Sequence, residues 1–187
     1  MAGFNAGKSE GILASIPIAL LNVICTPFAV KYIDRIGRRS ILLATIPGCT
    51  LSLLVLGISF YLMIYFDEAT SSFTKWMALL SILACVACFT FGIGPAVWII
   101  TSEIFPLRLR ATATSLCITT NWLSNFAVSM TFLSVMSTNV GMVLTWVVLS
   151  LFGVCFVMLV YYLVPETKGR RLEEILYLFG VNSYTAI

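Results

Sequence analysis

The 55 residues from Ala111 to Pro165 contain no charged side chain, and this run constrains the fold more than any other feature of the chain. One helix through the whole run would be about 80 Å long at about 1.5 Å per residue. A helix that crosses a bilayer needs only about 20 mostly apolar residues. The run must therefore fold back on itself, and the polar segment 137–141, which ends in a glycine, is where we expect the turn.

Three further uncharged runs precede this segment: Gly11–Val30, Ser40–Phe66 and Trp76–Ser102. The sequence therefore predicts an all-α membrane protein with five transmembrane helices, at about 11–32, 40–65, 76–102, 111–136 and 142–164. Strands of a membrane barrel are excluded, because the runs do not alternate in polarity every two residues. The composition agrees, since 60% of the residues are hydrophobic and 10% are charged, against about 25% charged in soluble domains.

The basic residues predict the orientation of these spans. Under alternating topology nine of the eleven Lys and Arg residues fall on one side of the membrane, which is a clear positive-inside bias. The loops at 33–39 and 103–110 and the tail at 165–187 are then cytoplasmic, and residues 1–10 form an extracytoplasmic segment. Leu172, Ile175, Leu176 and Phe179 recur at helical spacing, so we expect a short amphipathic helix in the tail.

Several function classes are disfavoured by the composition. The chain has no histidine and a net charge of +3, so neither a histidine-based active site nor nucleic acid binding is expected. We expect a protein that is not an enzyme and has no cofactor and no metal. The six cysteines lie in apolar stretches; Cys85 and Cys88 have a redox-like spacing, but no βαβ pattern surrounds them, which favours a packing role.

Each of the three cytoplasmic segments carries both acidic and basic residues: Asp34–Arg39, Glu103–Arg110 and Pro165–Arg170. Such charges can simply fix the topology. Ion pairs between helix ends can also close one face of a membrane protein and release it, as a gate requires. The predicted gate residues are Asp34, Arg35, Arg38, Arg39, Glu103, Arg108, Arg110 and Glu166.

These three motifs, together with Gly92-Ile-Gly-Pro95 and Trp98, occur in an order that resembles the C-terminal half of a sugar porter of the major facilitator superfamily. The resemblance implies a bundle of twelve spans in two halves, of which this chain would supply the eighth to the twelfth. The remaining N-terminal half would then be a partner. It implies a carrier that moves a sugar or polyol, such as a hexose or inositol, by alternating access. The alternatives are a non-transporting sensor or regulatory derivative and an inactive truncated product.

Polar side chains recur on one face of three spans, and such groups are costly in lipid unless they face a cavity or a partner. The resemblance implies that four of them line the sugar pathway: Asn22, Trp98, Asn121 and Asn125. Hydrogen bonding between helices is the alternative, and we favour it for the serines and threonines. Gly92, Gly94 and Pro95 are expected to interrupt the third span. Thr90 and Val97 stand where many relatives carry an acid and a second proline, which leaves proton coupling open.

Overall fold

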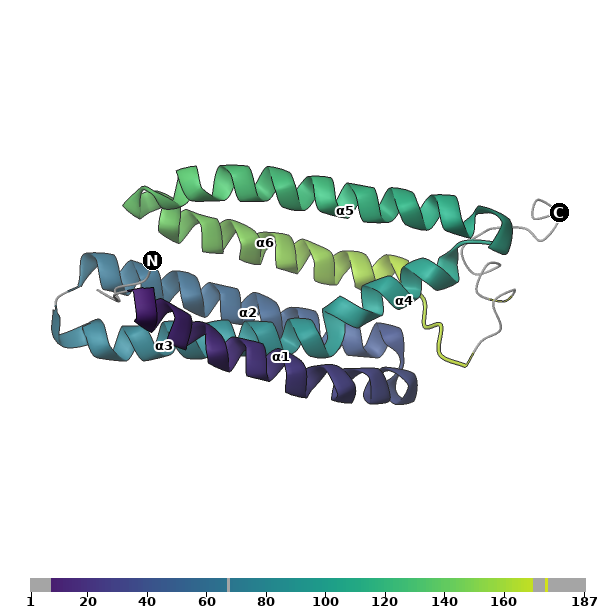
Figure 1. Cartoon of the computed structure of the whole chain (residues 1–187), viewed down its shortest axis with the longest axis horizontal. Helices are drawn as coiled ribbons and strands as arrows, with labels where there is room; N and C mark the ends of the chain where they lie inside the picture. Colours follow the sequence, from purple (N-terminus) through teal and green to yellow (C-terminus); the bar gives the residue numbers. More distant parts are fainter. Residues whose placement is uncertain (1–7, 67, 170–173, 175–187) are drawn as a thin grey trace.

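The computed structural model describes residues 8–66, 68–169 and 174, with the side chains of 8–14, 34 and 68–72 excepted. The described residues form helices joined by short turns and contain no strand. The elements are α1 (Lys8–Ile36), α2 (Arg38–Tyr65), α3 (Glu68–Cys88), the π-helix η1 (Phe89–Ile93), α4 (Gly94–Ile104), α5 (Leu107–Met136) and α6 (Asn139–Leu163). The helices run alongside one another as an elongated bundle (Figure 1). The expected all-α membrane fold is confirmed.

Four of the helical stretches are long and apolar enough to cross a membrane: Ser15–Ile33, Arg38–Tyr65, Phe73–Ile104 and Asn139–Leu163. The remaining long helix, α5, has 30 residues but is less apolar on average than the others. Its sequence carries arginines in the first turn and several Asn, Ser and Thr residues further on. The bounds of the five spans in the membrane, and the amphipathic tail helix, which lies outside the described residues, stay predictions.

Small residues let α2 pack closely against its neighbours. On the α3 side, a Cβ added to Gly92 would lie 2.1 Å from Oγ1 of Thr45, and one added to Gly48 would lie 2.9 Å from Sγ of Cys88. On the α6 side, a Cβ added to Gly153 would lie 2.4 Å from Oγ1 of Thr50. Because lipid gives helices no hydrophobic drive to associate, close van der Waals packing of this kind stabilises membrane bundles.

Two apolar clusters lie on either side of this contact region, and both are built around α2. The first contains Ile33, Ile41, Leu42, Ile46, Ala96, Ile100 and Val160. The second contains Leu56, Phe60 and Ala78, with Trp146 of α6 packed against them. The Trp146 ring stacks on Phe60 at 6.0 Å and meets Phe132 of α5 edge-on at 6.2 Å. The core therefore joins α2, α3 and α6, with α1 and α4 added at one end.

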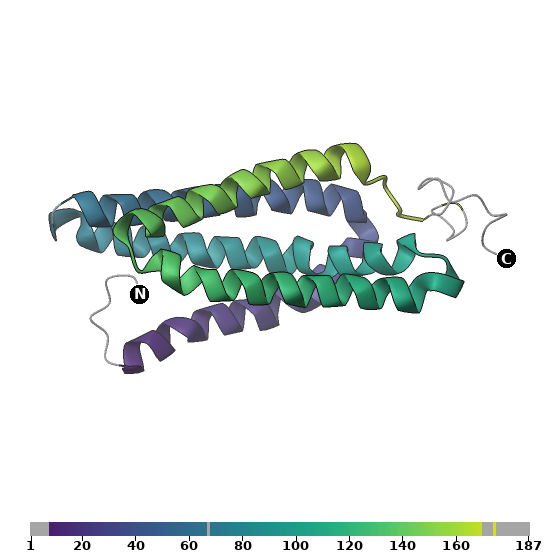
Figure 2. The same cartoon turned by 90° about the horizontal axis from the view of Figure 1, so that it is seen from above.

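Helix α5 lies at an edge of the bundle in Figure 1 and has no buried residue. It contacts α6 near the turn that connects them and α4 near its other end, and Figure 2 shows α5 and α6 diverging away from that turn. Large apolar side chains such as Trp122, Leu123 and Phe126 are more than 60% exposed on it. In a membrane such a surface faces lipid or another part of a protein.

The third predicted span is continuous, but one turn of it is wound as a π-helix. The N–H of Gly94 donates to the carbonyl of Phe89, five residues earlier, where an α-helix would use the fourth. Pro95 has no N–H, and its ring would crowd the preceding turn of an α-helix. The wider π-turn relieves this crowding, and Figure 1 shows that the helix axis changes direction between α3 and α4. The expected interruption is therefore a bend without a gap in the helix.

Candidate functional site

Asn22 of α1 is exposed and is held by two neighbours. The Thr90 hydroxyl donates to Oδ1 of Asn22, and the Thr26 hydroxyl donates to the backbone carbonyl of Asn22 at 2.7 Å. Thr90 lies in η1, so the π-helical turn brings this side chain to α1. Because Oδ1 is occupied by Thr90, the Nδ2 group of the amide is left to donate elsewhere.

The other three predicted pathway residues lie on α4 and α5. Trp98 is 44% exposed on α4. Asn121 and Asn125 are exposed on α5, where Nδ2 of Asn125 donates to the backbone carbonyl of Asn121 at 2.9 Å. Among the described residues no hydrogen bond joins these α5 amides to Asn22 or Trp98. The structure therefore shows four accessible side chains without a hydrogen bond between the α5 amides and the other two.

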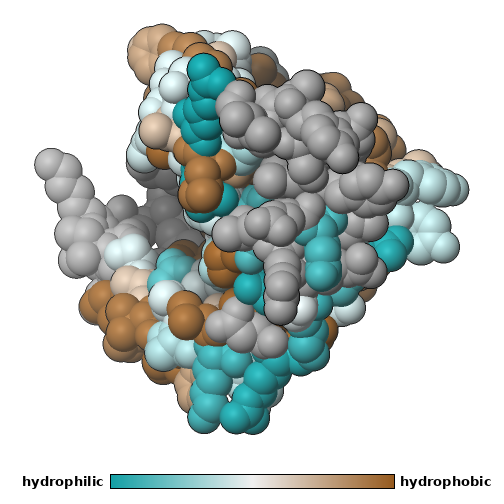
Figure 3. All heavy atoms as spheres, turned by 90° about the vertical axis from the view of Figure 1, so that its right-hand side faces the viewer, coloured by the Kyte–Doolittle hydropathy of each residue, from teal (hydrophilic) through white to brown (hydrophobic). Residues whose placement is uncertain are grey.

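The surface of the bundle is indented along one side. Figure 3 views the molecule from the end where α2 begins and shows a recess between the α5 side at the top and the α1 side at the bottom. Of the elements that carry the four predicted residues, α4 contacts both α1 and α5, whereas α1 and α5 do not contact each other in the described part of the chain. A polar solute could reach exposed amide groups from such an indentation without crossing the packed core.

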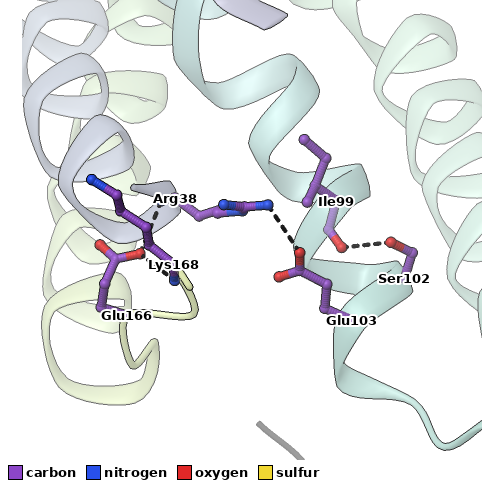
Figure 4. A network of polar contacts seen from close by, with 6 residues as sticks. All are labelled: Arg38, Ile99, Ser102, Glu103, Glu166 and Lys168. Carbon is purple, nitrogen blue, oxygen red and sulfur yellow. Dashed lines mark hydrogen bonds and ion pairs between the residues drawn. The ribbon is translucent and has the colours of Figure 1, made fainter. Parts of the chain in front are cut away.

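The charged motifs meet at the end of the bundle where α2 begins and α4 ends. Nη2 of Arg38 lies 3.2 Å from Oε1 of Glu103, and the two side chains are only 16% and 19% exposed. Figure 4 shows this pair spanning the space between the first turn of α2 and the last turn of α4. The other carboxylate oxygen, Oε2 of Glu103, is buried and has no hydrogen-bond partner within the described part of the chain.

Glu166 caps the N-terminus of α2. Its carboxylate accepts hydrogen bonds from the backbone N–H groups of Arg38 at 3.0 Å and Ser40 at 3.3 Å. It also accepts one from the backbone N–H of Lys168 at 3.1 Å. A negative charge at this position also compensates the positive end of the helix dipole. We expected Glu166 to belong to a set of ion pairs, and these contacts show it holding backbone groups of a helix end.

Gly37 makes this cap geometrically accessible. Its backbone has φ 108° and ψ 148°, a conformation that glycine adopts far more readily than other residues. A Cβ on Gly37 would also lie 2.6 Å from Oε2 of Glu166. The glycine of the first cytoplasmic motif and the glutamate of the third therefore fit together, although they are far apart in the sequence.

Two further basic side chains bind carbonyls at helix ends. Nη2 of Arg39 donates to the carbonyl of Tyr161 in α6 at 2.7 Å, and its guanidinium lies 5.6 Å from the centre of the Tyr161 ring. Nζ of Lys168 donates to the carbonyl of Arg35 at the end of α1. Cations at the C-terminal ends of helices are favourable for the same reason that Glu166 is favourable at an N-terminus.

The remaining predicted gate residues lie near this network. Nε of Arg110 donates to the carbonyl of Phe105 at 3.3 Å, which closes the turn between α4 and α5. Arg35 and Arg108 are exposed, and the side chain of Asp34 lies outside the described residues. Sequence reasoning overlooked the role of Lys168 and the capping role of Glu166. In the sequence, the features that could have indicated this cap are Gly37 directly before α2 and the acidic Glu166 in the tail.

The sequence pattern described as "Sugar (and other) transporter" matches residues 4–179. This chain belongs to that family. Within it, the chain is 37% identical over 178 residues to "Sugar transporter ERD6-like 16" and 38% identical over 172 residues to "Probable polyol transporter 4", both from Arabidopsis thaliana. It is 33% identical over 176 residues to the "Arabinose-proton symporter" of Escherichia coli.

These matches cover 92–94% of this chain but only 32–36% of the relatives. The chain thus spans about a third of the length of the curated relatives it matches. Among solved structures, the proton:xylose symporter XylE bound to 6-bromo-6-deoxy-D-glucose has a TM-score of 0.81 at 29% identity, over 94% of this chain and 36% of that chain. The inward-open form of XylE from E. coli has a TM-score of 0.74, over 91% and 36%. The expected major facilitator bundle is therefore confirmed as a partial one.

Proposed function

We propose that this chain forms part of a carrier that moves a sugar or polyol across a membrane by alternating access. One observation carries the proposal: the amides of Asn22, Asn121 and Asn125 and the indole of Trp98 are exposed on helices of a membrane bundle. Such groups are costly in hydrocarbon. An amide offers both donors and acceptors, which suits the hydroxyl groups of a sugar.

The substrate class is supported by the names of the relatives, which include sugar, polyol and arabinose transporters. We infer that the solute of this carrier is a sugar or polyol, such as a hexose or inositol. An indole such as Trp98 can stack on the apolar face of a pyranose ring while the amides bind its hydroxyl groups. The role of the protein is then to bind and release the solute unchanged, without a bond being made or broken.

We further propose that the Arg38–Glu103 pair belongs to a cytoplasmic gate. It joins two side chains from different helices, and α4 is connected to α3 through the bend at η1. Exposed ion pairs contribute about 0–1 kcal/mol each, but these two side chains are only 16% and 19% exposed, so this pair can shift the two-state equilibrium by more than an exposed pair would.

The remaining half of the bundle is the partner that we propose for the exposed helices. The share of the relatives that the chain covers and the lack of buried residues on α5 both support this. The nine-to-two distribution of basic residues supports a cytoplasmic C-terminus. The plasma membrane and an organelle membrane are equally compatible with these features.

The test is substrate binding and uptake. The chain is placed in lipid nanodiscs, and tryptophan fluorescence is recorded during titration with xylose, glucose or inositol. Uptake is measured in cells without endogenous sugar uptake, with the first seven spans of a relative co-expressed. We expect a saturable signal and uptake that Asn121→Ala reduces and that Asn139→Ala, an exposed amide at the start of α6, leaves unchanged. Binding without uptake would favour the non-transporting regulatory alternative, and the absence of both would reject the proposal.

A further inference from the structure

Two thiols meet at the interface between α2 and α3, outside the site described above. Sγ of Cys49 lies 3.1 Å from Sγ of Cys85. Both side chains are partly buried, and both thiols are free. Cys88 lies one turn further along α3, where its sulfur faces Gly48 of α2. The sequence spacing had directed attention to Cys85 and Cys88, but the structure pairs Cys85 with the cysteine of the neighbouring helix.

The close contact follows from the packing of small residues along this interface. Thr45 faces Gly92, Gly48 faces Cys88 and Cys49 faces Cys85, so the two helices run antiparallel in a fixed register. Each glycine lets the backbone of one helix approach the side chain of the other. The two sulfur atoms are therefore held together by the packing of the whole interface, and neither helix has to move far for them to react.

We propose that Cys49 and Cys85 form a redox-active dithiol that hydroperoxides close into a disulfide between α2 and α3. One sulfur attacks the peroxide, the O–O bond breaks, and a sulfenic acid and an alcohol (water, for hydrogen peroxide) result. The second thiol attacks the sulfenic sulfur, the S–S bond forms, and water leaves. The two thiols together lose two electrons and two protons, and the hydroperoxide takes up both to give the alcohol and water.

The geometry favours the second step of this reaction. A disulfide has an S–S bond of about 2.05 Å, so the sulfurs approach by only about 1 Å from their present separation. Holding two reacting groups in contact makes their reaction effectively unimolecular. The first step is the slower one, because partly buried thiols are less reactive than exposed thiolates.

The bond would tie α2 to α3 about one turn before the π-helical bend. Thr45 of α2 packs on Gly92 within that bend, so a fixed α2–α3 distance would restrict how η1 and α4 move against α2. We therefore expect oxidation to slow the carrier; this consequence rests on the proposed function, whereas formation of the disulfide does not.

The test begins with the chemistry alone. The full chain in nanodiscs is first reduced, freed of reductant and treated with tert-butyl hydroperoxide. It is then unfolded in the presence of an alkylating reagent that blocks the remaining thiols. The digested protein is analysed by mass spectrometry. We expect the number of free thiols to fall from six to four, a peptide pair joined through Cys49 and Cys85, and recovery of all thiols with dithiothreitol. Six alkylated thiols, or a bridge between Cys85 and Cys88, would overturn the proposal.

Two variants sharpen the result. Cys49→Ser should abolish the bridge and leave a sulfenic acid on Cys85 that dimedone traps, whereas Cys155→Ser, which alters an exposed cysteine of α6, should leave the bridge unchanged. Uptake is then measured before and after oxidation. A bridge that forms without slowing an active carrier rejects the regulatory consequence and keeps the dithiol. A carrier without any uptake counts against the proposed function, and the mass spectra remain decisive for the dithiol.

Discussion

Replacing Gly37 by alanine should destabilise the bundle through two separate effects. The first is backbone strain, because φ 108° and ψ 148° lie in a region that costs a residue with a side chain about 1–3 kcal/mol. The second is steric, because the new Cβ would lie 2.6 Å from Oε2 of Glu166 and would push the carboxylate off the α2 N-terminus. A hydrogen bond to a charged group contributes about 1.5–3 kcal/mol, so the total loss should reach about 3 kcal/mol or more.

The matched control is Gly169→Ala. Gly169 also has a positive φ, 72°, but nothing lies within 4 Å of the position that a Cβ would occupy. This variant should lose only the strain of a left-handed residue, about 1–2 kcal/mol. The free energy of unfolding is measured for both variants in the same detergent, by loss of helical circular dichroism with increasing denaturant.

A double-mutant cycle isolates the cap. Glu166→Ala alone should cost about 1.5–3 kcal/mol, because the N–H groups of Arg38 and Ser40 lose their acceptor. In that background Gly37→Ala has no carboxylate to displace, so only the strain remains. The double variant should therefore lose about 1.5–3 kcal/mol less than the sum of the single variants, because the sum counts the loss of the cap twice. Additive losses, or equal losses for Gly37→Ala and Gly169→Ala, would refute the reasoning.

Three further predictions concern the gate, the pathway and the packing of the bend. Arg38→Lys and Glu103→Gln should each slow uptake while the substrate affinity stays within a few-fold, since Lys cannot reproduce the guanidinium geometry; normal uptake in both would leave the pair with a purely topological role. Thr90→Val should weaken substrate binding by about 1 kcal/mol, measured by fluorescence titration, and Thr90→Ser should restore it; unchanged affinity in the valine variant would remove Thr90 from the pathway. Gly92→Ala should lower the free energy of unfolding by about 1–3 kcal/mol, because the new Cβ would lie 2.1 Å from the Thr45 side chain of α2. Gly94→Ala should cost far less, because the atom nearest to its Cβ lies at 3.4 Å.

The helical fold could be predicted from the sequence because long uncharged runs leave a membrane chain few choices. The runs are helical, and the turn within the longest one lies at Ser137 and Thr138. Gly141, which looked like part of that turn, lies in the first turn of α6, where a Cβ would be 2.0 Å from the carbonyl of Val135. Glycine is common both in turns and where backbones approach each other closely, so only the three-dimensional structure distinguishes the two roles.

Pairings between distant motifs could not be predicted in the same way. The charges of Arg38, Glu103 and Glu166 indicated one shared face, but the composition of the loops does not reveal which oxygen meets which N–H. Glu166 binds backbone groups, whose positions follow from where α2 begins. Likewise, Pro95 indicated a disturbed helix, but the sequence does not reveal that the disturbance is a π-turn or that Thr90 of this turn meets Asn22 of another helix.

The contacts at the cytoplasmic end divide into two kinds with different consequences for motion. Glu166, Lys168 and Arg39 hold backbone groups at the ends of α2, α1 and α6, respectively. These contacts attach the ends of three helices to one another, through the segment that follows α6 for Glu166 and Lys168 and directly from α2 for Arg39. The Arg38–Glu103 pair joins two side chains, so it can separate while both helices stay intact. Because α4 is attached to α3 through the bend at η1, α4 is the element that we expect to move. The other three contacts would keep α1, α2 and α6 together as the frame against which it moves.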